Sequence, residues 1–152
     1  MLNLPRHIIV FDTEFTAWPG SQERNWGAPG EYKEIVQIGA VKVETENFVE
    51  IDSLDIFIRP QLNPVLSDYF ITLTGITQKV VDKKGIDYLN AIKQFYLWSQ
   101  TLPLYSYGGD EKELEGNCKL LKIAFPFERS RFFDIRDVFK KFDPMVIRYY
   151  II

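Results

Sequence analysis

The order of apolar and polar residues predicts a mixed β-sheet. Residues 8–11 form a continuous β-branched and aromatic run, which is typical of a strand buried on both faces. Residues 34–43 and 51–58 have the composition of two further strands, and the turn residues 45–47 favour an antiparallel pairing between them. Two later runs predict further short strands, at residues 103–107 and 132–135.

Helical segments follow the third of these strands. Gly75 is placed to end a first short helix, and Thr77 to cap the next one. Residues 87–99 repeat apolar positions at the spacing of a helix that packs on a sheet. Residues 110–122 predict a helix with an acidic first turn, and residues 138–142 the start of another. The pattern therefore predicts one α/β domain with a mixed sheet flanked by helices.

Composition narrows the possible classes of protein. The 152 residues are 46% hydrophobic and 15% aromatic, which fits a globular domain with a core of its own. The net charge of −3 argues against a protein that coats nucleic acid through Lys and Arg. An enzyme that holds one strand end through metal ions remains compatible with it, because the ions bring their own positive charge.

Two absences add expectations about location. No run of about 18 apolar residues occurs and no secretory signal is recognisable, so we expect no membrane span. Cys118 is the only cysteine, which excludes an internal disulfide and any cysteine-based zinc site. A reducing compartment, the cytoplasm, is the predicted location.

Asp12 and Glu14 are the first candidates for chemistry. Residues i and i+2 of an extended chain point to the same face, so both carboxylates can meet just as the first strand ends. Two such carboxylates repel each other unless a cation lies between them, and oxygen ligands suit Mg²⁺ or Mn²⁺. A turn-capping aspartate beside a solvated glutamate is the structural alternative, and an isolated Asp-x-Glu would favour it.

Asp110 is the third candidate. It follows the strand at 103–107 and the pair Gly108-Gly109, where glycine permits a sharp turn. A helix-capping aspartate is the alternative, and the two roles are compatible. Three carboxylates at the ends of strands on one edge of an α/β sheet are the arrangement that two-metal phosphoryl transfer needs.

These residues also carry a resemblance to a known family. Residues 9–16, which contain Asp12 and Glu14, resemble the first motif of the DEDDh-type 3′–5′ exonucleases, and residues 34–43 resemble their second strand. The series 57–60, 66–68 and 73–78 is similar to the branch of histone-mRNA 3′ exonucleases and Eri-type RNA exonucleases. Residues 106–114 fall at the place of the second motif. The likeness runs from about residue 8 to residue 142.

The resemblance implies a fold, an activity and roles for single residues. The fold would be ribonuclease-H-like, and the activity hydrolysis at the 3′ end of RNA, with single-stranded DNA as an open alternative. Asp12, Glu14 and Asp110 would hold Mg²⁺ or Mn²⁺. The residues expected to contact the substrate are Phe15, Thr16, Leu73 and Thr74. Leu73 as an ordinary core leucine is equally compatible with the sequence, and base stacking by Trp18 or Trp26 is a minor alternative to their partial burial.

The resemblance also implies a third motif, a general-base His followed by an Asp, after residue 142. Neither follows in residues 143–152, and His7 lies at the far end of the first strand from Asp12. We therefore expect residues 1–152 to be one exonuclease domain that is incomplete at its C-terminus and lacks its last helix. A non-catalytic remnant that binds nucleic acid or a partner is the rival expectation.

Overall fold

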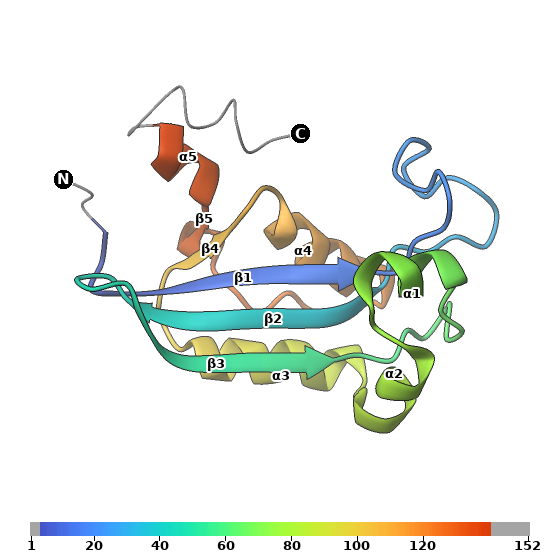
Figure 1. Cartoon of the computed structure of the whole chain (residues 1–152), viewed down its shortest axis with the longest axis horizontal. Coiled ribbons are helices and arrows are strands. Elements are labelled where there is room, and N and C mark those ends of the chain that lie inside the picture. The colour runs from blue at the N-terminus through green and yellow to red at the C-terminus, as the bar shows by residue number, and fades with distance from the viewer. Residues whose placement is uncertain (1–3, 141–152) are drawn as a thin grey trace.

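The computed structural model describes residues 4–140, which form a mixed five-stranded sheet with helices around it (Figure 1). The strands are β1 (His7–Phe15), β2 (Ile35–Glu44), β3 (Val49–Phe57), β4 (Leu104–Ser106) and β5 (Phe132–Asp134). Their order in the sheet is β3-β2-β1-β4-β5. The first three are antiparallel, whereas β4 runs parallel to β1 and β5 parallel to β4. The predicted antiparallel unit with added parallel strands is confirmed.

The helical segments are α1 (Asp68–Thr74), α2 (Gln78–Lys84), α3 (Tyr88–Ser99), α4 (Asp110–Leu120), η1 (Arg129–Arg131) and α5 (Ile135–Lys140). The helix predicted at 138–142 thus starts three residues earlier, and its last two residues lie outside the described part. The expectations for a third motif and a last helix also fall outside it. Within residues 4–140, no helix is long and apolar enough to cross a membrane.

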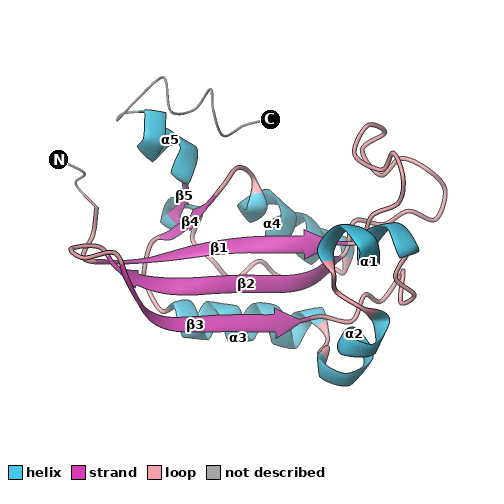
Figure 2. Cartoon of the chain, in the orientation of Figure 1, coloured by secondary structure: helices cyan, strands magenta, loops and turns pink. Residues whose placement is uncertain are grey.

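One face of the sheet carries the main core. Ile9 and Phe11 of β1 are buried against α3 and α4, and the ring of Phe11 lies 5.5 Å from that of Phe95. Figure 2 shows α3 behind β3, running along the length of that strand. The opposite face forms an open and mostly apolar hollow that α5 borders. Residues that line it include Val10, Asp12, Val41, Tyr107, Ile135 and Phe139.

The helix ends follow the predicted signals. Gly75 has the left-handed φ of 75° that ends α1, and the Thr77 hydroxyl accepts a hydrogen bond from the backbone N–H of Val80 at 3.3 Å. Both predictions are therefore confirmed. Asp87, predicted as the first residue of its helix, is the cap of α3 and accepts from the N–H of Asn90 at 2.9 Å.

Two glycines with open surroundings offer a matched test of this backbone. We expect Gly75→Ala to destabilise the protein by about 1–2 kcal/mol, because an added Cβ meets no atom but strains the left-handed backbone. Gly116→Ala, at an equally open position inside α4, should instead stabilise by about 0.5–1 kcal/mol. Urea midpoints at equal m-values measure both changes. Shifts of the same sign would contradict the left-handed end of α1.

Candidate active site

Asp12 and Glu14 lie within β1, not at its end. The expectation that the strand stops before Asp12 is wrong, because the ladder with β2 continues and pairs Asp12 with Gly39 and Glu14 with Gln37. Backbone pairing therefore overrides the low strand preference of these polar residues. Alternate positions of a strand share a face, and both side chains line one cavity, so their predicted convergence is confirmed.

Asp110 is joined to β1 by hydrogen bonds at the edge where β4 stops. The N–H of Ile9 donates to the carbonyl of Pro103, so alternate N–H groups of β1 face β4. Beyond the end of β4 at Ser106, the N–H of Thr13 has no strand partner. Asp110 Oδ1 accepts from this N–H at 3.1 Å and from the Thr13 hydroxyl at 2.6 Å. The carboxylate thus takes the place of a strand and is itself buried.

The start of α4 explains how Asp110 reaches this position. Gly108 has a φ of 105°, which residues other than glycine rarely adopt. Gly109, the next residue, is the N-cap of α4. The alternative that Asp110 caps the helix is therefore wrong, because it is the first helical residue and its carboxylate bonds to β1. The predicted acidic first turn is confirmed by Asp110, Glu111 and Glu113.

A cavity of about 580 Å³ brings the three carboxylates to one place. It lies between β1, the loop after it and the start of α4. The lining residues are Asp12, Thr13, Glu14, Phe15, Gln22, Asn25, Trp26, Lys33, Tyr107, Gly109, Asp110 and Glu113. Five of the twelve lining residues are charged, and four of these five are carboxylates.

The surroundings raise the pKa of each candidate carboxyl. Burial is the main cause for Asp12, Glu14 and Asp110. Repulsion from the two aspartates raises the pKa of Glu14 further, while the Thr13 hydroxyl partly offsets the effect at Asp110. No residue within the described range forms an ion pair with any of the three. A partly buried, mutually repelling group of this kind is typical of a functional site.

The chemical type of these side chains suits a hard divalent cation. Carboxylate oxygens are the ligands that Mg²⁺ and Mn²⁺ favour. As they are placed, no three Asp, Glu, His or Cys side chains among residues 4–140 lie close enough to hold one ion. Metal–oxygen distances are only about 2.0–2.6 Å, so all three carboxylates could bind one ion only if their side chains moved closer together.

The raised pKa of Glu14 has a testable consequence for the metal-free protein. A carboxyl whose pKa is raised in the folded state destabilises the fold when it is ionised. For Glu14 this cost is absent at a pH below the ordinary pKa of 4.5 and is complete at a pH above the raised pKa. In EDTA we therefore expect Glu14→Gln to raise Tm at pH 7–8 by about 2–4 °C, the shift that about 1 kcal/mol gives in a domain of this size.

The size of this effect should change with pH. The Tm gain of Glu14→Gln over the unmodified chain is expected to shrink toward zero as pH falls to about 4.5. Glu46→Gln, an exposed site in the β2–β3 turn, serves as the control and should leave Tm unchanged at every pH. A gain that grows on acidification would contradict the burial of Glu14 among negative charges.

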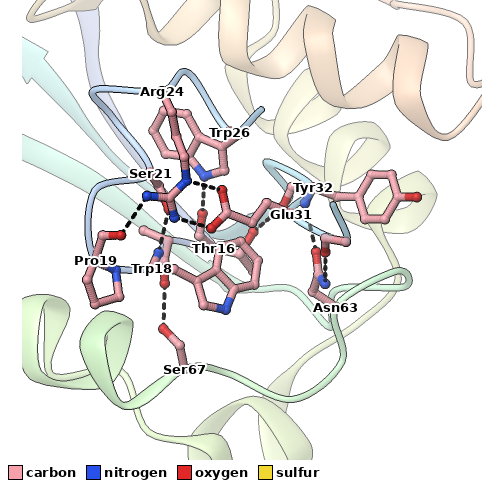
Figure 3. A network of polar contacts seen from close by, with 12 residues as sticks. Thr16, Trp18, Pro19, Ser21, Arg24, Trp26, Glu31, Tyr32, Asn63 and Ser67 are labelled. Carbon is pink, nitrogen blue, oxygen red and sulfur yellow. Dashed lines mark hydrogen bonds and ion pairs between the residues drawn. The ribbon is translucent and has the colours of Figure 1, made fainter. Parts of the chain in front are cut away.

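The long loop between β1 and β2 is held in place at several points (Figure 3). The indole N–H of Trp26 donates to the carbonyl of Thr16 at 2.8 Å, and the Ser67 hydroxyl donates to the carbonyl of Ala17 at 2.5 Å. Arg24 pairs with Glu31 within the loop. Trp26 and its neighbour Asn25 both have positive φ, an uncommon conformation that places them against the cavity. The predicted loop is confirmed.

The four predicted substrate contacts have different environments. Phe15 lines the cavity beside Asp12 and Glu14. The Thr16 hydroxyl is buried, donating to the carbonyl of Tyr32 and accepting from the N–H of Glu34. Leu73 and Thr74, on α1, are not among the lining residues.

The two α1 residues differ in exposure. Leu73 is 65% exposed, so its interpretation as a core leucine is wrong. The Thr74 hydroxyl donates to the carbonyl of Phe70 at 2.9 Å and accepts from the N–H of Ile76. The structure therefore brings Phe15 to the carboxylates, whereas Thr16, Leu73 and Thr74 do not line that cavity.

Lys33 and Glu113 line the cavity but were not predicted. Glu113 follows Asp110 by three residues in a predicted helix, a spacing that places both on the same face and could have identified it. Lys33 lies two residues before β2, and only the pairing of β2 with β1 places it beside Phe15.

Comparison with known proteins identifies the family of this chain. The profile of the protein family described as "Exonuclease" matches residues 9–149. The chain belongs to the exonuclease family. The match extends past residue 142, the predicted end of the sequence resemblance. Its sheet with flanking helices has the ribonuclease-H-like fold of the DEDDh members of this family, as predicted.

Named relatives point to the same branch. The chain is 27% identical over 146 residues to the human protein "3'-5' exoribonuclease 1", covering 90% of this chain and 40% of the relative. The solved nuclease domain of 3'hExo, a DEDDh family member bound to rAMP, matches with a TM-score of 0.75 at 26% identity over 90% of this chain and 70% of that one.

A second solved structure concerns 3'-end-specific recognition of the histone mRNA stem-loop by a 3'-exonuclease. It matches with a TM-score of 0.73 and 25% identity, over 92% of this chain and 64% of that one. The chain spans less than half the length of the human 3'-5' exoribonuclease 1. DEDDh exonucleases generally use divalent metal ions. The predicted Eri-type family resemblance is confirmed.

Proposed function

We propose that this chain hydrolyses phosphodiester bonds at the 3′ end of single-stranded RNA, using Mg²⁺ or Mn²⁺ held by Asp12, Glu14 and Asp110. The observation that carries the proposal is that these three carboxylates, from β1 and α4, face one cavity and none of them forms an ion pair with a residue in the range 4–140. In a chain of the exonuclease family, that arrangement suits a site completed by metal ions.

The protein's own residues would hold and orient the reacting groups. Thr13 fixes Asp110 through two hydrogen bonds, so that carboxylate needs little reorganisation when an ion binds. Asp12 and Glu14 would close around the ions from β1. The bound ions would supply Lewis-acid stabilisation of the phosphate and an activated water.

The substrate would enter past the aromatic wall of the cavity. Phe15 would contact the terminal nucleotide, since it lies beside Glu14 and lines the same cavity. Leu73, largely exposed on α1, would meet a base further along the strand. For Thr16 and Thr74 we propose a positioning role, because both hydroxyls are engaged within the protein.

RNA is the proposed substrate because the relatives are named as exoribonucleases and one solved structure concerns the 3′ end of an mRNA stem-loop. Single-stranded DNA remains the alternative substrate. A cytoplasmic location, predicted from the single cysteine, belongs to the same proposal.

The test is digestion of a 5′-labelled single-stranded RNA in the presence of Mn²⁺. We expect a ladder that shortens from the 3′ end, while the same RNA in circular form should stay intact. A DNA of the same sequence, run in parallel, measures the sugar preference. Cleavage of the circle, or an intact linear RNA, would reject the proposed activity.

A second candidate function is binding without hydrolysis. It is favoured by the absence of a three-ligand metal group among residues 4–140 and by the position of His7, the only histidine. His7 and Asp12 are five residues apart on β1, which is about 16 Å. Fluorescence anisotropy of a labelled RNA separates the candidates, because binding with no shortening of the RNA would favour this one.

A further inference from the structure

Lys33 occupies an unusual position on the wall of the carboxylate cavity. Its Nζ atom lies 4.1 Å from the ring centroid of Phe15 and 4.3 Å from that of Trp26. The two rings meet edge to face at 5.4 Å. The same Nζ atom is 2.7 Å from Glu113 Oε2. One ammonium group is therefore held by three side chains from three separate segments.

Lys33 is the only basic side chain among the described residues that line this cavity. It is accompanied by four carboxylates, of which Glu113 also raises the pKa of Asp110. A nucleic-acid strand that brings its phosphates into so negative a space needs positive charge beyond the metal ions at the scissile bond. Lys33 is the group of the cavity wall that can supply it.

The contacts of Lys33 prepare it for this role. An ordinary surface lysine must lose much of its side-chain freedom to bind an anion, at a cost of about 1.5–2 kcal/mol. Here two aromatic rings and Glu113 already restrict the side chain, so less freedom remains to be lost. The side chain is nevertheless 26% exposed, which leaves the ammonium accessible from the cavity.

The backbone around Lys33 fixes the position further. The carbonyl of Lys33 accepts a hydrogen bond from the Asn117 side chain of α4 at 3.1 Å. Trp26 is held in its left-handed conformation by two bonds: its indole N–H donates to the carbonyl of Thr16, and its backbone N–H donates to the carbonyl of Ser21. A non-glycine residue in this conformation costs energy that the fold must offset, and such strain is often found where a ligand is held.

We propose that Lys33 binds a backbone phosphate of the strand whose 3′ end lies in the cavity, with Glu113 as the counter-ion that the phosphate displaces. The inference rests on the proposed function, since it assumes a nucleic-acid strand in this site. Phe15 and Trp26 act as the walls that keep the ammonium directed at that phosphate. Lys33 is a positioning and binding residue, and the chemistry remains with the carboxylates.

The test compares Lys33→Met with Lys33→Arg, using anisotropy of a fluorescein-labelled single-stranded 12-nucleotide RNA in Ca²⁺ at several salt concentrations. Methionine keeps an apolar stem against the two rings but removes the charge. Each phosphate contact contributes about −0.7 to the slope of log K against log[salt] for a single strand. We expect Lys33→Met to weaken binding about tenfold and to flatten the slope by about 0.7. Lys33→Arg keeps the charge and should keep the slope of the unmodified chain.

Two further variants separate this contact from general electrostatics. Lys93→Met removes the same charge from α3, remote from the cavity, and should leave the slope unchanged. Glu113→Gln removes the competing counter-ion and should tighten RNA binding severalfold. Tm values of Lys33→Met and Lys33→Arg equal to that of the unmodified chain would show that the changes in RNA binding do not reflect unfolding.

The outcomes distinguish this inference from the proposed activity. An unchanged salt slope in Lys33→Met, in a chain that shortens RNA, would overturn the role of Lys33 alone. A flattened slope in a chain that binds RNA but does not cleave it would support Lys33 and reject hydrolysis. A chain that fails to bind the RNA at all would overturn both.

Discussion

Asp12→Asn is expected to lower the rate of Mn²⁺-dependent RNA shortening by at least about 100-fold, the scale of losing one group that stabilises the transition state. Asparagine keeps the size of the side chain and one oxygen but loses the negative charge that holds a cation. Because Asp12 faces the cavity and is not part of the core, the fold should be unaffected. Initial rates with the 5′-labelled RNA measure the change.

The matched control is Asp82→Asn. Asp82 is an exposed aspartate on α2, outside the cavity, and its Oδ1 accepts from the Gln78 side chain, an interaction that asparagine retains. The two variants share one chemical change, so only position differs. Equal rates for both would show that the carboxylate of Asp12 takes no part in the reaction.

The effect of a metal ion on Tm is a second test of the role of Asp12 as a metal ligand. A ligand that binds the folded state at 100 times its Kd stabilises it by about 2.7 kcal/mol. We expect Mn²⁺ to raise the Tm of the unmodified chain and of Asp82→Asn, and to have little effect on Asp12→Asn. This measurement remains informative even where hydrolysis is slow, as it would be in a site without an imidazole base, which is typically worth 10²–10⁴-fold.

Local signals in the sequence predicted much of the fold. The apolar run at 8–11, the helical spacing at 87–99 and the stop at Gly75 each depend on neighbours within a few residues. Such features can be recognised because periodicity and backbone preference are local properties. The structure accordingly contains every strand and every α-helix that these signals predicted within its described range.

The features that were missed depend on contacts between distant parts of the chain. β1 extends through Asp12 and Glu14 only because β2 continues to pair with it. The bond between Thr13 and Asp110 joins residues 97 positions apart. Lys33 meets Glu113 only after α4 has packed beside the end of β1. No single window of sequence contains this information, so the acidic residues could be named but not their partners.

Glu34 is the strongest example of such a hidden contact. It lies directly before β2, is only 1% exposed, and its carboxylate accepts hydrogen bonds from three successive backbone N–H groups. The donors are Gln61, Leu62 and Asn63. From the sequence it appears as the polar first residue of a strand. In the structure it fixes the turn that leads from β3 to α1.

Glu34→Ala should therefore be among the most destabilising single changes in this chain. An N–H that loses its partner out of reach of water costs about 1–3 kcal/mol, so three such groups, which are partly buried here, imply a loss of roughly 3–9 kcal/mol. That is a large part of the 5–15 kcal/mol that a typical domain has in total. Urea unfolding measures the loss, and Glu46→Ala, an exposed glutamate in the β2–β3 turn, should be neutral within about 0.5 kcal/mol.

Glu34→Gln separates hydrogen bonding from packing. Glutamine fills the same space but offers one accepting oxygen, and its amino group faces N–H donors, so we expect an intermediate loss. The effect should reach the candidate site, because Asn63 bonds to the backbone of both Tyr32 and Gly30 in the loop that carries Trp26 and Lys33. Weaker RNA binding by Glu34→Gln at a temperature where it is fully folded would show that this carboxylate also holds the loop in place; unchanged binding would confine its role to stability.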